Sequence, residues 1–250
     1  MATEASPVAR GRIIALDLAR GAALVAMAIY HFGYDLAAFG RIGPEVMVTG
    51  FWAIYARAVA GTFLFLVGIG LWLAHGSGIR WAAFLKRLAQ VAAGAVLVSF
   101  GTWKLFGAGS FVFFGILHSI AVSSLIGLLF LRLPVAVTLA AAVAAFLAPR
   151  FLQTGAFDMP WLLWTGLTTL PVHAVDYVPT FPWLAPVLAG LAVAKLTSRH
   201  GHWSRLRSVA PPEGALYWLT LPGRHSLLVY LIHQPVLFGS VWLAVRLGLV

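Results

Sequence analysis

The 250-residue sequence contains no cysteine, and this absence removes several classes of chemistry at once. Disulfides, thiolate nucleophiles and cysteine-ligated metal sites all require a thiol, so none of them is available to this chain. Thioester intermediates on a protein side chain are excluded for the same reason.

Charged residues are also scarce: they make up 10% of the chain, whereas 61% is hydrophobic and the mean hydropathy is +0.93. A water-soluble domain of this length needs a much more polar surface. We therefore predict an all-α, polytopic transmembrane helical bundle in which lipid covers the apolar outer face.

Apolar stretches of suitable length define the expected helices. A Trp-rich stretch at 159–171 is a candidate eighth element that either lies along the membrane interface or re-enters the bilayer. No repeat or soluble second domain is visible, so we expect a short lead at 1–12 and a single membrane domain at 13–250. The seven predicted spans are 13–38, 50–74, 83–104, 110–131, 134–148, 181–197 and 225–248.

Acidic residues number only 7, against 17 Lys and Arg, and the basic residues are unevenly placed. Positive residues near span ends are retained on the cytoplasmic side. Most of them fall on one side if the N-terminus is inside, so we predict a multi-pass inner (plasma) membrane protein with a cytoplasmic N-terminus and an outer C-terminus. The net charge of +10 follows from this bias, and nucleic-acid binding is not expected.

The first predicted span carries ionisable residues, which lipid disfavours. At 100° per residue, one side of this helix projects four of them: Asp17, Arg20, His31 and Asp35. Arg20 and His31 lie about 16 Å apart along the axis, in the inner and outer halves of the span. Asp17 can pair with Arg20 at i, i+3. His31 can pair with Asp35 at i, i+4, which lowers the cost of burying the charge.

A carboxylate beside His31 orients the imidazole so that its other nitrogen is available as a general base. The alternative is that such pairs only lock helix packing, and this is the interpretation we adopt for Asp17, which is close to the cytosol. For His31 we expect a functional role, because ionisable residues deep in a membrane usually serve function.

Two other spans carry histidines, His118 near the expected depth of His31 and His233 near that of Arg20. His118, in FFGILHSIA, is expected about 12 Å from the outer end of its span. His233, in SLLVYLIHQPVLF, is expected about 12 Å from the inner end of the last span. Each alone is typical of a hydrogen-bonded packing residue. Together with His31 they indicate a polar internal cavity, which Arg57 of the second span can join.

Several pieces of the sequence together resemble a known family. RGAALVAMAIYH, an Arg and a His separated by ten residues, is similar to the signature of the transmembrane acyltransferases that include acyltransferase-3 proteins. The series DLARGAALVAMAIYHFGYDL, TFLFLVGIGL, FGILHSIA, DYVPTFPWLAPVLAG and GRHSLLVYLIHQPVL resembles the bacterial DUF1624 family, which is related to the heparan-alpha-glucosaminide N-acetyltransferase catalytic domain. The resemblance extends from Asp17 to Pro235.

This resemblance implies transfer of an acetyl or other acyl group from cytosolic acyl-CoA, most simply acetyl-CoA, to an acceptor at the outer face, a sugar or glycoconjugate. It implies that Arg20 helps to hold the donor, that His31 acts as base or acyl-transfer residue, and that Asp35 orients it. CoA phosphates are anionic and suit Arg. Arg224 at the inner mouth can attract the nucleotide end, although positive-inside retention also explains its position.

The chain departs from the lysosomal relatives at one point. They have Asn where His31 stands and place their essential His in the following outer loop, whereas GRIGPEVMVT here contains none. This difference favours His31 as a base for direct transfer. No metal is expected. The predicted site comprises the catalytic residues His31, Asp35, His118 and His233 and the donor-binding residues Arg20, Arg57 and Arg224.

Two other functions stay open on the sequence alone. Inward-facing histidines such as His31 and His118 can ligate a haem iron in an electron-transfer protein, which an intense Soret band would reveal. A polar stripe can also line the pathway of a small-solute transporter, which would give flux without acyl transfer.

Overall fold

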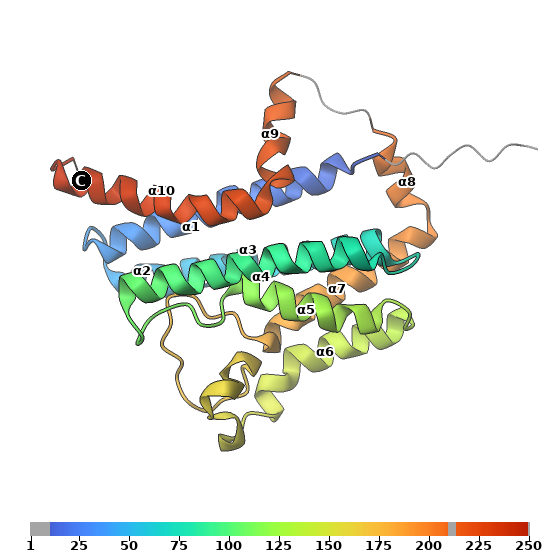
Figure 1. Cartoon of the computed structure of the whole chain (residues 1–250), viewed down its shortest axis with the longest axis horizontal. Coiled ribbons are helices and arrows are strands. Elements are labelled where there is room, and N and C mark those ends of the chain that lie inside the picture. Colours follow the sequence, from blue (N-terminus) through green and yellow to red (C-terminus); the bar gives the residue numbers. More distant parts are fainter. Residues whose placement is uncertain (1–10, 210–213, 250) are drawn as a thin grey trace, which may run out of the picture. The chain divides into compact units, whose positions relative to one another are not determined.

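A computed structural model describes residues 11–209 and 214–249, so most of the predicted lead at 1–12 lies outside the described residues. The described chain is helical and contains no strand, only an isolated bridge between Phe114 and Tyr177 (Figure 1). Five helices have the length and composition to cross a membrane, and two shorter apolar helices accompany them. The prediction of an all-α, polytopic membrane protein is confirmed.

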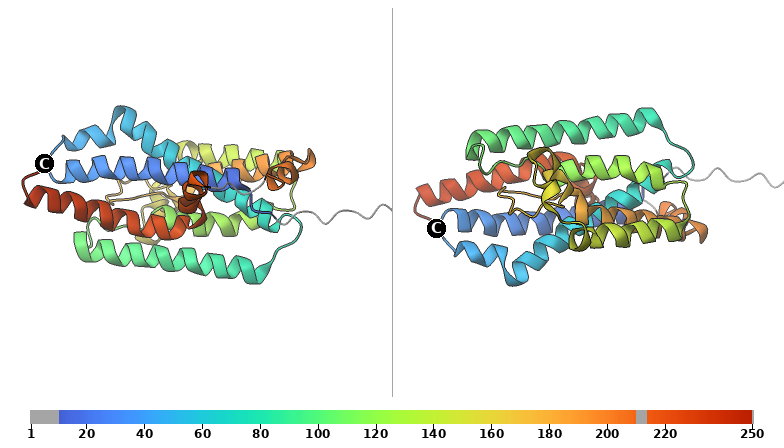
Figure 2. Two further views of the ribbon diagram at one scale, coloured as in Figure 1. Left: turned by 90° about the horizontal axis from the view of Figure 1, so that it is seen from above. Right: turned by 90° about the horizontal axis from the view of Figure 1, so that it is seen from below.

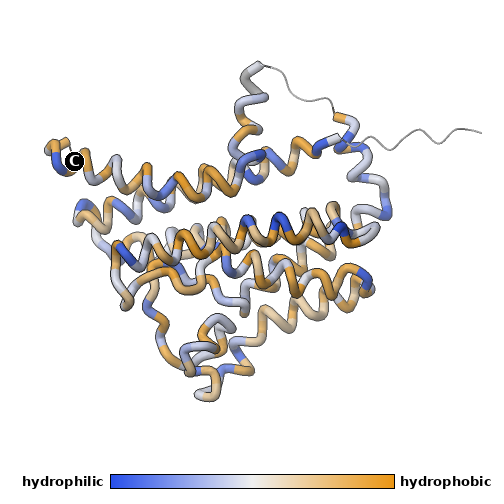
Figure 3. The backbone as a smooth tube through the Cα atoms, in the orientation of Figure 1, coloured by the Kyte–Doolittle hydropathy of each residue, from blue (hydrophilic) through white to orange (hydrophobic). Residues whose placement is uncertain are grey.

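Each of the seven predicted spans corresponds to a helix, and apolar residues dominate these helices (Figure 3). They are α1 (Ile14–Ala38), α3 (Gly50–His75), α4 (Trp81–Phe106), α5 (Ile116–Phe130), α6 (Val135–Phe151), α7 (Thr180–Arg199) and α10 (Ser226–Arg246).

Helix α5 begins well inside the predicted span 110–131, at Ile116. The residues before it are apolar but not helical, because their backbone pairs with a distant loop instead. The Val175 N–H donates to the Ser110 carbonyl at 3.1 Å, and the Val178 N–H donates to the Phe114 carbonyl at 3.0 Å.

The remaining elements are short. The candidate eighth element at 159–171 contains a six-residue 3-10 helix, too short to cross a bilayer. The short elements are α2 (Pro44–Val48), η1 (Gly155–Phe157), η2 (Pro160–Thr165), α8 (His202–Arg207) and α9 (Ala215–Arg224).

Contacts group the chain into two compact units. The terminal unit joins the chain up to Pro44 to the chain from Leu196 onward, and the central unit is Glu45–Lys195. The single membrane domain expected at 13–250 stays a prediction.

In the terminal unit, α1 packs against α9 and α10. Glycine permits the contact with α9: a Cβ on Gly223 would lie 1.8 Å from the Asp17 carbonyl oxygen, and one on Gly21 would lie 3.3 Å from that of Leu219. Helices α1 and α10 lie side by side and run in the same direction (Figure 2). This parallel arrangement places residues of equal depth opposite one another.

The central unit is held together by a similar close approach of α3 and α7. A Cβ on Gly68 would lie 1.9 Å from the Val187 carbonyl oxygen, and one on Gly190 would lie 2.0 Å from that of Phe65. Helices of a membrane bundle associate through such small residues, which let their backbones meet. An apolar cluster joins α6 to α7 beside this contact: Ala142, Ala145, Leu184, Ala185 and Leu188.

A buried lysine closes the turn between α5 and α6. The Lys195 ammonium donates to the carbonyl oxygen of Phe130, to that of Leu133 at 2.8 Å and to Thr138 Oγ1 at 3.2 Å. Carbonyls at a helix C-terminus have no intrahelical partner, and a cation there is favourable.

Gly190→Ala should destabilise the protein, because the added methyl overlaps a backbone carbonyl that cannot move without separating α3 from α7. The expected loss is about 1–3 kcal/mol or more, measured as a lower thermal transition in detergent. Gly61→Ala, where nothing lies within 4 Å of the added atom, is the matched control. Equal transitions for the two variants would contradict this description of the packing.

Candidate functional site

The parallel packing of α1 and α10 brings two of the predicted histidines together. The expectation that His233 lies near the depth of Arg20 is wrong, because the register of the two helices places it against His31. The ring centroids of His31 and His233 are 5.1 Å apart, with the rings edge to face. Tyr30 contacts His31 and Tyr230 contacts His233, at centroid distances of 5.7 and 5.5 Å. A tyrosine of α1 and a tyrosine of α10 therefore flank the two imidazoles in the terminal unit.

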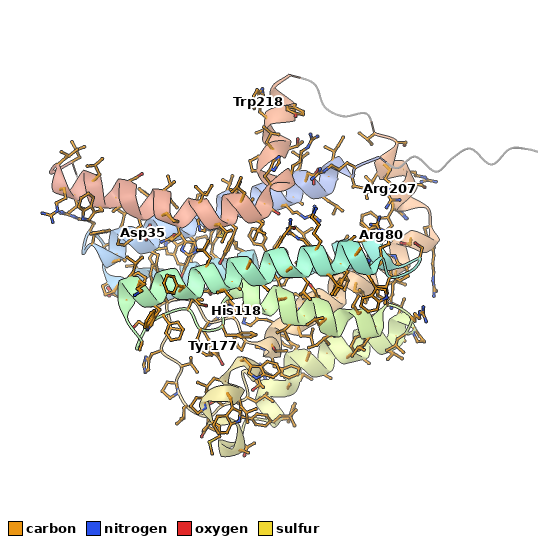
Figure 4. The ribbon with its side chains drawn as sticks, in the orientation of Figure 1. Asp35, Arg80, His118, Tyr177, Arg207 and Trp218 are labelled. Carbon is orange, nitrogen blue, oxygen red and sulfur yellow. The ribbon has the colours of Figure 1, made fainter. Side chains whose placement is uncertain are left out.

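Asp35 also lies on α1, four residues after His31, but its hydrogen-bond partner differs from the predicted one (Figure 4). Gln234 of α10 donates from Nε2 to Asp35 Oδ1 at 2.8 Å, and Asp35 is only 2% exposed. No hydrogen bond joins His31 to Asp35 among the described residues, because an amide from the neighbouring helix reaches the carboxylate instead. Gln234 was missed as a site residue, and its adjacency to His233 was the available signal.

The hydrogen bond of His233 defines its tautomer. Nδ1 lies 2.5 Å from the Tyr230 carbonyl oxygen, which can only accept, so Nδ1 carries the proton. In the neutral ring the lone pair is then on Nε2. This nitrogen is buried and has no hydrogen-bond partner among the described residues.

Three buried acceptors of this region lack a partner in the described part of the chain: His233 Nε2, Asp35 Oδ2 and Gln234 Oε1. Buried polar atoms in folded proteins are normally paired, since an unmet acceptor costs free energy. All three are hydrogen-bond acceptors, so a group that bound here would meet them with N–H or O–H donors.

A second polar cluster surrounds Asp17, near the start of α1. Its carboxylate, 2% exposed, contacts Arg12 at 2.7 Å, Arg20 at 3.4 Å and Arg224 at 3.9 Å. The Arg224 guanidinium also stacks on Tyr217, 4.9 Å from the ring centroid. The pairing of Asp17 with Arg20 is as predicted, while Arg12 was missed. Three guanidinium groups around one carboxylate leave an excess of positive charge that suits an anion.

His118 belongs to the central unit and lies in the first turn of α5, not about 12 Å inside the helix as predicted (Figure 4). The Gly115 N–H donates to Nδ1 at 3.2 Å, so Nε2 carries the proton and faces Ser99 Oγ at 3.3 Å. Ser99 in turn donates to the Val112 carbonyl oxygen. One ring nitrogen caps the helix and the other bonds to Ser99 of α4, so both are engaged, which explains this histidine without catalysis.

Arg57 lies exposed on α3 in the central unit. Its role in donor binding stays a prediction. No group of three or more His, Asp or Glu side chains is placed to hold a metal ion among the residues that the structure describes.

Comparison with protein families matches residues 12–235 to the model of the catalytic heparan-alpha-glucosaminide N-acetyltransferases. The chain belongs to this family. Searches among curated proteins and among solved structures gave no match. Membership in the heparan-alpha-glucosaminide N-acetyltransferase family makes the chain a multi-pass membrane transferase of an acetyl-transferring family, which implies an acetyl donor.

In this family member, a carboxylate joins His118 in the cap of α5. Asp176 Oδ2 accepts the Ile116 N–H at 3.1 Å. Desolvation of the half-buried side chain raises the pKa of Asp176 from 3.8 to about 6, although that hydrogen bond acts in the opposite direction. Burial also raises the pKa of Tyr177 to about 12, and its hydroxyl donates to the Leu163 carbonyl at 2.6 Å.

Asp176→Asn should change the pH dependence of stability. A raised folded-state pKa favours the wild type when Asp176 is protonated, and this contribution is lost as the pH rises from about 4 through 6. Asn keeps an acceptor for the Ile116 N–H without the charge. The transition temperature of the variant should therefore rise relative to that of the wild type as the pH increases over this range. The opposite sign is expected for Asp158→Asn, since hydrogen bonds from Thr168 and Thr169 lower the pKa of Asp158. A pH-independent difference for Asp176→Asn would contradict this account.

Proposed function

We propose that the chain transfers an acetyl group from acetyl-CoA to an amine, with His233 Nε2 as the general base. The observation that carries the proposal is the set of three buried, unpartnered acceptors on His233, Asp35 and Gln234. A substrate amine supplies the missing donors, and a base with a directed lone pair is among the acceptors that would bind it.

Asp35 favours an amine over a hydroxyl. It is buried, and none of the ion pairs among the described residues includes it. A buried carboxylate without a cation is costly, and an ammonium group bound to Oδ2 would supply the missing charge. Gln234 supports this role, because its hydrogen bond to Oδ1 leaves Oδ2 for the substrate.

The proposed reaction uses the imidazoles of His233 and His31. The ammonium loses one proton to His233 Nε2, and the amine nitrogen forms a bond to the thioester carbonyl carbon. The carbon–sulfur bond breaks, and the CoA thiolate leaves with the second proton from nitrogen. His31, whose ring contacts that of His233, is placed to donate a hydrogen bond to the carbonyl oxygen as charge develops there.

For the donor, we propose the cluster around Asp17. Arg20 and Arg224 offer guanidinium groups to the phosphates of CoA, and Arg12 adds a third. Arg20 and His31 are about 16 Å apart along α1, a span that a pantetheine arm can bridge. In this proposal the donor comes from the cytosol, and the acceptor is an amino sugar or glycoconjugate at the outer face. The protein lies in the inner membrane.

His233→Gln should lower kcat by about 10²- to 10⁴-fold, because the amide cannot take a proton. Proteoliposomes with labelled acetyl-CoA are offered an amino sugar and its neutral hydroxyl analogue, and the labelled product is identified. His173→Gln, an exposed histidine of the central unit, is the matched control. Wild-type turnover by His233→Gln would remove His233 from the mechanism, and label on the hydroxyl analogue alone would exclude N-transfer.

Arg224→Gln should raise the KM for acetyl-CoA by about tenfold to a hundredfold and change kcat less, because the guanidinium binds the donor at a distance from the reacting atoms. The matched control is Arg246→Gln at the C-terminal end of α10, where the guanidinium stacks on Trp242. An unchanged KM in Arg224→Gln, or an equal rise in both variants, would place the donor elsewhere.

A further inference from the structure

Helices α5 and α6 are short for a membrane crossing. With 15 and 17 residues they span about 22 and 25 Å, less than the roughly 30 Å of a typical hydrocarbon core. They are joined by a tight turn, so the start of α5 and the end of α6 lie at the same end of this hairpin. The residues at that end therefore decide how the short hairpin is matched to the thicker hydrocarbon core.

The chain leaves α6 at this end and forms what we call the Trp lobe, residues 152–170, which contains η1 and η2. Large apolar side chains at the end of α6 and on the lobe are exposed. Phe151 at the end of the helix is 78% exposed, Trp161 is 69% exposed and Leu170 is 54% exposed. Further exposed apolar residues of the lobe are Leu152, Met159 and Trp164.

Several polar groups of the lobe hydrogen-bond to one another. Asp158 accepts hydrogen bonds from Thr168 Oγ1 at 2.7 Å and from the N–H and Oγ1 of Thr169, both at 2.8 Å. The Thr154 N–H donates to the Leu167 carbonyl oxygen at 3.3 Å. These bonds hold the loop in a fixed shape that presents its apolar residues outward.

We propose that the Trp lobe is embedded in the headgroup layer of the membrane at the end of the α5–α6 hairpin and anchors that hairpin at its depth. Trp is suited to this layer because its ring is apolar and its N–H is polar. The hydrocarbon core is a poorer location, because lipid-exposed irregular backbone is not tolerated there. Arg150, exposed in the last turn of α6, can extend its guanidinium to the lipid phosphates.

The absence of native cysteine allows a direct test in the full-length protein. Trp161→Cys is labelled with a polarity-sensitive fluorophore and reconstituted into phosphatidylcholine vesicles. Lipids with a nitroxide at the headgroup, or deep in the acyl chain, and aqueous iodide serve as quenchers. Val143→Cys, 58% exposed in the middle of α6, reports the hydrocarbon core, and His173→Cys reports an exposed loop. All three positions are exposed, so the label does not disturb packing.

For position 161 we expect blue-shifted emission and severalfold stronger quenching by the headgroup nitroxide than by iodide. The deep nitroxide should act mainly on position 143, and iodide mainly on position 173. Iodide quenching at 161 equal to that at 173 would overturn the proposal in favour of an aqueous lobe. A quenching profile at 161 equal to that at 143 would overturn it in favour of a re-entrant segment. Neither result depends on the catalytic proposal, since no step measures acyl transfer.

Discussion

The terminal unit depends on one buried carboxylate. Asp17 is paired with arginines from before, within and far beyond the first helix, and a glycine of α9 rests against its backbone carbonyl. Removing one partner from a buried charge is far more costly than the pair itself is favourable. The cluster therefore holds the start of α1 against the end of α9 and so fixes where α10 begins. The position of α10 in turn determines which residues face His31.

Helix positions were predictable because hydropathy is a local property, and all seven spans follow from apolar runs of adequate length. The failures occurred where a distant segment decides the local structure. Apolar residues before Ile116 pair with the loop at 175–178 and so do not extend α5. The segment that forms α9 mixes apolar and polar residues, and its packing on α1 through Gly223 is invisible in a linear pattern.

The same distinction applies to the candidate site. The pairing of Asp17 with Arg20 was predictable, since residues three apart on a helix are neighbours. The register of α1 against α10 places His233 against His31. The same register lets Gln234, and not His31, form the hydrogen bond to Asp35. His118 met the criteria of an intramembrane histidine, but a shortened helix places it at a terminus, where its ring accepts a backbone N–H and bonds to Ser99.

Lys195 has a consequence for a protein whose family handles activated acetyl groups. A primary amine is itself a nucleophile toward such a donor, and its reaction with the donor would be irreversible self-modification. The buried Lys195 directs its N–H bonds to two carbonyls and a threonine hydroxyl, so its nitrogen would have to leave these acceptors before it could attack a thioester. The interaction that closes a helical turn thus also keeps this side chain chemically inert.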